Sequence, residues 1–136
     1  TKKNDTNKIV RKWTSSLEEG LQSNNKINEK INNGWMPPHT TLFFKKDLLN
    51  EIGYYDENFK ISSDYDFILK MFRQRNLKIF FLNKFTVKMR SGGMSNKNFS
   101  NIIIKMREDF SIMKKFKLNA FKTILIKNFS KIKQFF

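Results

Sequence analysis

Residues 61–70 read ISSDYDFILK, and the rest of the chain can be organised around this stretch. We expect Ser63 to cap a helix that runs to about Arg75, because Asp66 follows three places later in a pair that resembles a capping box. The apolar residues behind it recur at helical spacing and predict a core-facing side; they are Phe67, Ile68 or Leu69, Met71 and Phe72. The first turn of the predicted helix therefore carries two carboxylates, Asp64 and Asp66.

Three further runs predict β-strands. Residues 40–44 are β-branched and aromatic, which favours a buried strand, and apolar residues fill 77–82 and 85–89. Between the first two strands, residues 45–52 predict a short helix that Gly53 ends. Strands and helices mixed in this way indicate an α/β fold.

The remaining segments predict helices. Sparse apolar residues over 17–31 predict one or two weak, exposed helices that stop at an Asn-Asn-Gly signal. A long helix is expected to start near Asn98, with an apolar stripe formed by Phe99, Ile102, Ile103, Met106, Phe110 and Met113. Residues 117–119 should break it, and 120–136 predict a last helix with one apolar and one basic side.

The composition bounds the class of protein. The 136 residues include 27 Lys and Arg against 12 Asp and Glu, a net charge of +15, and 39% of them are hydrophobic. This apolar content supports a folded core and excludes a disordered polar tail. The absence of cysteine excludes a disulfide framework and thiolate chemistry, and one histidine cannot build a zinc site alone. The charge leaves nucleic acid, anionic membranes and phosphorylated substrates open as partners.

Four short motifs follow one another along the chain. They are GWMPPH at 34–39, GYYDE at 53–57, SDYDF at 63–67 and KMRSGGMS at 88–95. In this order they resemble the C-terminal half of the bacterial family 2 nucleotide-sugar glycosyltransferases, GT-A-fold enzymes that build cell-surface polysaccharides. Each motif is weak alone, and their order along most of the chain makes the resemblance specific.

The resemblance implies an α/β fold in two parts. Residues 1–97 would be the acceptor-side portion of a GT-A catalytic domain, and 98–136 would be amphipathic basic helices. The family's nucleotide-binding half, with the Asp-x-Asp motif that holds Mn²⁺ or Mg²⁺ and the donor diphosphate, has no counterpart here. The sequence starts at Thr1 without a methionine. We therefore expect a fragment that is inactive alone, with the ligands of the divalent metal mainly outside it.

Asp64 is the candidate general base. In an inverting transfer, an acceptor hydroxyl attacks the anomeric carbon of the donor sugar and a carboxylate accepts its proton. A helix N-terminus favours the ionised carboxylate. The family has Glu where this chain has Ser63, but the position of the base is kept. The alternative is that Ser63, Asp64 and Asp66 serve only as cap and first-turn residues; Asp66 is either structural or orients the acceptor.

The motif at 88–95 supplies candidate ligands for the leaving diphosphate. Arg90 offers a bidentate fork to phosphate, Gly92 and Gly93 let backbone N–H groups approach closely, and Ser95 adds a hydroxyl. The resemblance implies that this loop closes over the donor. An ordinary turn between a strand and a helix is the alternative.

Two residues of the first motif are candidate substrate ligands. The resemblance places His39 near the donor or acceptor sugar, although a lone histidine is more often structural. Trp35 either stacks on a sugar ring or covers the core, and the sequence leaves both open.

The charge distribution suggests a membrane partner. Residues 110–136 contain seven lysines and no acidic residue, which is typical of a helix on an anionic membrane surface and would suit a lipid-linked acceptor. The alternative is that this segment forms a helix that packs on the family's nucleotide-binding half, with its lysines in solvent. No apolar run reaches the length of a membrane span and no signal peptide is visible, so we expect a cytoplasmic protein, peripheral on the inner face of the membrane.

Two other functions compete with glycosyl transfer from a nucleotide sugar to a glycan or lipid-linked acceptor. The net charge and the aromatic residues would suit a basic nucleic-acid-binding module, but no nucleic-acid-binding signature is present and the lysines are spread along the chain. The second competing function is a membrane-surface adaptor without catalysis. Only the transferase gives each residue of the third and fourth motifs a role, so we expect an enzyme and no nucleic-acid partner.

Overall fold

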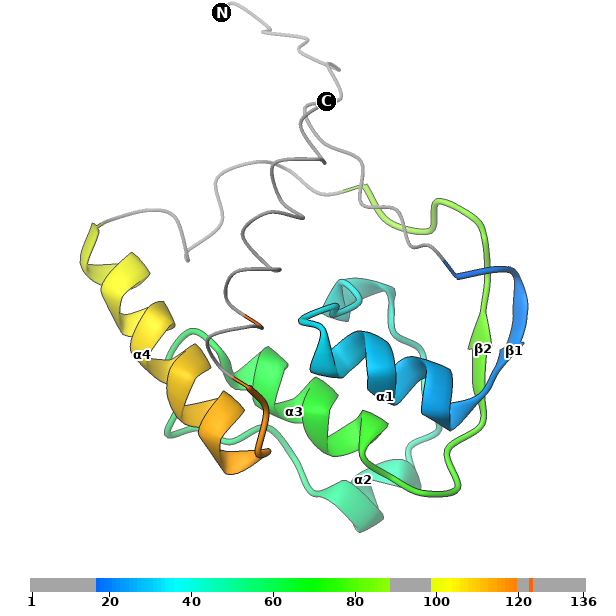
Figure 1. Cartoon of the computed structure of the whole chain (residues 1–136), viewed down its shortest axis with the longest axis horizontal. Coiled ribbons are helices and arrows are strands. Elements are labelled where there is room, and N and C mark those ends of the chain that lie inside the picture. Colours follow the sequence, from blue (N-terminus) through cyan, green and yellow to red (C-terminus); the bar gives the residue numbers. More distant parts are fainter. Residues whose placement is uncertain (1–16, 89–98, 120–122, 124–136) are drawn as a thin grey trace, which may run out of the picture.

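The computed structural model describes residues 17–88, residues 99–119 and Thr123, and these form a small mixed α/β unit. The elements run in the order β1 (Gly20–Gln22), α1 (Asn24–Asn32), the 3₁₀ turn η1 (His39–Thr41), α2 (Leu48–Ile52), α3 (Ser63–Phe72), β2 (Ile79–Phe81) and α4 (Phe99–Lys115). Figure 1 shows α3 in the middle, with α4 on one side and the β1–β2 pair on the other.

Helix α3 is the centre of the core, as its sequence predicts. The main cluster joins α1, α3 and α4 and consists of Leu17, Ile27, Ile31, Tyr65, Ile68, Leu69, Phe72, Ile112, Met113 and Leu118. A second cluster on another side of α3 contains Ile52, Phe67 and Met71. A helix that is apolar on most sides is buried, and α3 is enclosed by α1, α2 and α4. The main cluster takes residues from both 1–97 and 98–136, so α4 shares its core with the preceding segment.

The two strands form a short antiparallel ribbon. Leu21 of β1 lies opposite Phe80 of β2, and both side chains point to solvent. The strand predicted over 77–82 is confirmed in its central three residues. The described part of the run 85–89, residues 85–88, forms no strand.

The strand predicted over 40–44 is wrong. The chain there makes the turn η1 instead, in which the Thr41 backbone N–H and hydroxyl both donate to the Pro38 carbonyl, at 2.9 and 2.8 Å. These local bonds satisfy groups that a strand would offer to a neighbour. Phe43 is 83% exposed, so the aromatic run is not buried.

Two expectations about the helices are also corrected. The N-cap residue of α3 is Ser62, while Ser63 is the first helical residue, and no side-chain capping bond is made by Ser62. In 17–31 the only helix is α1, and it is exposed on one side only, because Ile27 and Ile31 are buried while Lys26 and Glu29 are exposed. The stop signal is confirmed, since α1 ends at Asn32.

The long helix α4 starts and ends close to the predicted residues, and Lys117 leaves it with φ of 54°. Its predicted apolar stripe, however, faces outward. Of that stripe only Met113 is buried, and the inward side of α4 carries Asp109 and Ile112 instead. Among the described helices none has the length and apolar character to cross a membrane. The helix predicted over 120–136 lies outside the described residues, apart from Thr123.

The chain after α1 depends on a close approach at Gly34. Its φ is 80°, and a Cβ added there would lie 2.9 Å from the backbone oxygen of Thr123. We expect Gly34→Ala to lower the free energy of unfolding by about 2 kcal/mol, because it adds both backbone strain and a clash. Gly53→Ala is the matched control, since Gly53 has φ of 75° but an added Cβ meets nothing within 4 Å. Equal losses in urea unfolding would contradict the close approach.

Candidate active site at the start of helix α3

A carboxylate from α4 fixes the loop that leads into α3. The backbone N–H of Lys60 donates to Glu108 Oε1 at 2.8 Å, and those of Ile61 and Ser62 donate to Oε2 at 3.0 and 2.9 Å. The N-terminal N–H groups of a helix and its entry loop lack partners of their own, and here one distant side chain satisfies three of them. We call this arrangement the Glu108 clamp.

The neighbouring Asp109 reinforces the clamp. Ser62 Oγ donates to Asp109 Oδ1 at 2.7 Å, and Lys105 Nζ lies within 3.0 Å of both carboxylate oxygens. Burial, and to a smaller degree the charge of Asp109, raise the pKa of the Tyr65 phenol, which therefore stays neutral at physiological pH. Helices α3 and α4 thus meet at a polar joint directly before Asp64.

Asp64 and His39 come together at the surface next to this joint. His39 Nδ1 lies 3.9 Å from Asp64 Oδ2, and the two side chains are 48% and 36% exposed. The other oxygen, Oδ1, accepts the backbone N–H of Tyr65 at 2.8 Å. Asp64 is therefore held through one oxygen, while the second faces a histidine and solvent. Such a pair can accept a proton from a hydroxyl that approaches from outside.

The prolines before His39 explain its position. Pro38 has φ of −62° and ψ of 124°, an extended conformation that delivers the chain into η1, and His39 is the first residue of that turn. The bonds from Thr41 to the Pro38 carbonyl close the turn behind it. The imidazole is thereby carried on a locally fixed segment and not on an open loop.

Asp66 lies in a different environment from Asp64. It is fully buried, and Lys115 Nζ donates to its Oδ1 at 2.7 Å. Lys70 Nζ lies 2.9 Å from Oδ2, an ion pair whose angle does not favour a hydrogen bond. Lys115 also lies 3.8 Å from Asp56. The pKa of Asp56 is lowered, chiefly by the backbone N–H of Asn58. Asp66 thus joins α3 to the end of α4.

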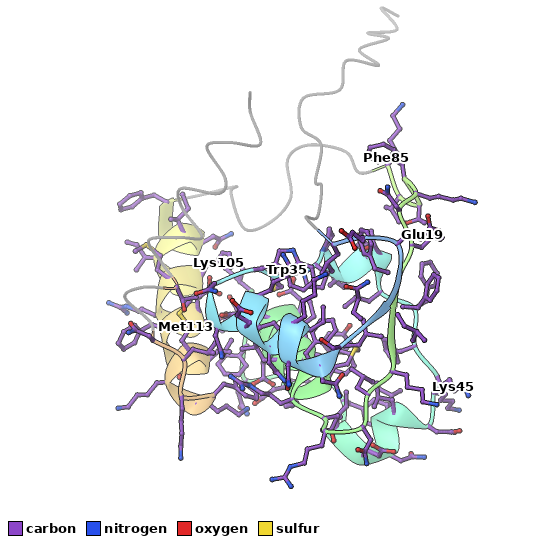
Figure 2. The ribbon with its side chains drawn as sticks, turned by 45° about the vertical axis from the view of Figure 1, so that its right-hand side comes forward. Glu19, Trp35, Lys45, Phe85, Lys105 and Met113 are labelled. Atoms are coloured by element: carbon purple, nitrogen blue, oxygen red, sulfur yellow. The ribbon has the colours of Figure 1, made fainter. Side chains whose placement is uncertain are left out.

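Trp35 is not beside Asp64. Its ring packs against Phe72, with 6.4 Å between centroids, at the C-terminal end of α3. Phe72 follows Asp64 by eight residues, a rise of about 12 Å along the helix. Figure 2 shows Trp35 near α1, where it lines an open hollow with Lys26, Glu29, Lys30 and Asn33. Trp35 is therefore a partly buried residue packed against the main core, and stacking of its ring on a sugar stays a prediction.

The diphosphate ligands and the metal remain predictions. Arg90, Gly92, Gly93 and Ser95 lie outside the described residues. Over 17–88, 99–119 and Thr123, no group of three His, Asp or Glu side chains could hold a metal ion. The expectation that the ligands of Mn²⁺ or Mg²⁺ lie mainly outside this chain stays a prediction.

Sequence reasoning missed Glu108 and Asp109. A signal was present, because these two are the only acidic residues among the last 39 of a strongly basic chain. Local patterns give no indication, however, that their partners lie 46 to 48 residues earlier.

The chain was compared with protein families, curated proteins and solved structures. No family model, no curated protein and no solved structure matches this chain. The class that the fold and site define is thus a small mixed α/β unit with an exposed His–Asp pair at a helix N-terminus.

Proposed function

We propose that this chain is the acceptor-side part of a nucleotide-sugar glycosyltransferase with Asp64 as its general base. The observation that carries the proposal is the His39–Asp64 pair, in which two residues 25 positions apart meet at the solvent-exposed start of α3. Both belong to the ordered motifs at 34–39 and 63–67. The surrounding polar joint supports the proposal, because it fixes the backbone on which the base is carried.

In the proposed reaction an acceptor hydroxyl forms a bond to the anomeric carbon of the donor sugar. The bond from that carbon to the diphosphate oxygen breaks, and its electron pair leaves with the nucleoside diphosphate. Asp64 Oδ2 takes the hydroxyl proton, since Oδ1 is engaged by the Tyr65 N–H. Attack from the face opposite the leaving group inverts the anomeric centre.

The remaining roles belong to the same proposal. Arg90, Gly92, Gly93 and Ser95 would bind the leaving diphosphate, and His39 would orient Asp64 and the acceptor. Asp66 is assigned a structural role because it is buried and ion-paired with two lysines. The acceptor would be a glycan or a lipid-linked glycan on the cytoplasmic side of the membrane. The expected Mn²⁺ or Mg²⁺ ion would be held mainly by ligands outside this chain.

The test follows nucleoside diphosphate release. The purified protein, expressed from its natural start codon, is incubated with Mn²⁺ or Mg²⁺, a panel of nucleotide sugars and lipid-linked acceptors. Release that requires both one donor and one acceptor would support the proposal. A folded protein that releases nucleoside diphosphate from no donor would contradict it.

A smaller effect is expected at His39. We expect His39→Asn to lower kcat about tenfold and leave the free energy of unfolding nearly unchanged, because the ring is about half exposed and lies 3.9 Å from the Asp64 carboxylate. If the two residues act as one unit, the double variant with Asp64→Asn should lose no more than Asp64→Asn alone. Independent, additive losses would contradict the pairing.

A further inference from the structure

Helix α4 turns an apolar stripe away from the core. Phe99 is 77% exposed, Met106 62% and Phe110 54%, and Ile102 and Ile103 are also exposed. Their spacing of three, four and seven residues places them along one side of the helix, over a length of about 17 Å. Figure 1 shows α4 at the edge of the described chain, and the exposed fractions place the stripe on the surface of the described residues. Contiguous exposed apolar side chains of this kind mark interaction surfaces.

Two basic side chains border the stripe on one side. Arg107 follows Ile103 by four residues and Lys114 follows Phe110 by four, so each lies next to an apolar member of the stripe, and both are exposed. Long basic side chains beside an apolar stripe can keep their charged ends in a headgroup layer while the stripe enters the acyl region.

The acidic residues of α4 point the other way. Glu108 accepts the backbone N–H groups of 60–62, and Asp109 accepts the Ser62 hydroxyl. The described helix contains no other carboxylate. Its outward face therefore combines apolar and positive side chains with no negative charge, because the fold engages both negative charges inside.

We propose that this outward face of α4 docks on an anionic lipid surface. The apolar stripe would enter the boundary between headgroups and acyl chains, and Arg107 and Lys114 would contact lipid phosphates. A net charge of +15 adds long-range attraction to the same surface. Phe, Ile and Met in a stripe that two cations border on one side fit lipid better than nucleic acid, whose backbone offers charge but little apolar surface. The proposal is independent of the proposed sugar transfer, since it is measured without donor or acceptor.

Vesicle binding tests the proposal with the 136-residue chain. Sedimentation with vesicles of phosphatidylcholine alone is compared with vesicles containing one-third phosphatidylglycerol, a mixture chosen to supply negative charge. We expect binding only to the acidic vesicles, and an affinity at least tenfold lower for Arg107→Glu/Lys114→Glu and for Phe99→Ser/Phe110→Ser. All four side chains are exposed, so the fold should tolerate the changes, and circular dichroism checks this.

Matched controls make the same kinds of substitution away from α4, so that an effect of the place on the molecule can be told from an effect of the changed charge or apolar area. Lys45→Glu/Lys46→Glu changes the net charge by the same amount, and Figure 2 shows Lys45 on the side of the molecule away from α4. Leu21→Ser/Phe80→Ser removes comparable exposed apolar side chains from the β1–β2 ribbon. Both controls should bind like the wild type. Equal losses in controls and α4 variants would overturn the proposal, as would absent binding.

A second copy of the chain is the competing occupant. If sedimentation velocity shows a dimer that Phe99→Ser/Phe110→Ser dissociates, while the wild type does not bind acidic vesicles, the face is a dimer interface and the proposal is wrong. A monomer that binds acidic vesicles through α4 supports it.

Discussion

Replacing Asp64 by asparagine is expected to lower the rate of nucleoside diphosphate release by about 100- to 10,000-fold, the usual contribution of a general base. Asparagine has nearly the same shape and its carbonyl oxygen can still accept the Tyr65 N–H, so the fold should be unchanged. Donor binding should persist, because the lost function is proton transfer. Single-turnover release and donor binding, measured on the same samples, would separate the two effects.

The control for this change is Asp47→Asn. Asp47 is also exposed and also stands at the start of a helix, where it is the N-cap residue of α2 and makes no side-chain capping bond. It should leave the rate unchanged. If Asp64→Asn retained the wild-type rate, Asp64 would be a first-turn residue without a catalytic role, and the proposed mechanism would fail.

Replacing Glu108 by alanine is expected to lower the free energy of unfolding by about 3 kcal/mol. The change leaves three backbone N–H groups of the loop 60–62 without their acceptor, and hydrogen bonds to a charged partner are each among the stronger ones in proteins. The Lys60 N–H is exposed and can turn to water, so the three losses do not add fully. Because the loop leads into Asp64, we expect slower nucleoside diphosphate release as well.

Two further variants serve as comparisons for Glu108→Ala. Glu108→Gln retains a carbonyl acceptor and should cost only about 1 kcal/mol. Glu29→Ala removes an exposed carboxylate from α1 and should change stability by less than about 0.5 kcal/mol. Urea unfolding gives all three values. A loss for Glu108→Ala no larger than that for Glu29→Ala would show that the clamp does not stabilise the fold.

Local patterns predicted the main helices correctly. The run of apolar residues behind Asp64 predicted the buried helix α3, and the glycine at 53 marked the end of α2 with its φ of 75°. These predictions succeed because helical periodicity, caps and left-handed glycines depend on residues within one or two turns. For the same reason Asp64 could be placed in the first turn of α3 before any contact was known.

Predictions that depended on distant partners failed. Residues 40–44 have β-branched and aromatic side chains, but a strand also needs a neighbouring strand, and β1 and β2 pair with each other instead. The turn η1 satisfies the backbone locally. The capping prediction at Ser63 failed in a similar way, because α3 begins one residue earlier and the hydroxyl of its N-cap residue, Ser62, donates to Asp109 of α4.

The sequence by itself determined the mixed α/β class, the positions of α2, α3 and α4, the two carboxylates at the start of α3 and the strong positive charge. The tertiary structure alone decided which side of α4 packs inward. Apolar residues at helical spacing include both the buried Ile112 and Met113 and the exposed Phe99 and Phe110, so the spacing does not show which of them face the core. The tertiary structure also brought His39 to Asp64 and Glu108 to the loop before it. Such contacts depend on how whole elements pack, and periodicity within an element carries no information about the partner that it meets.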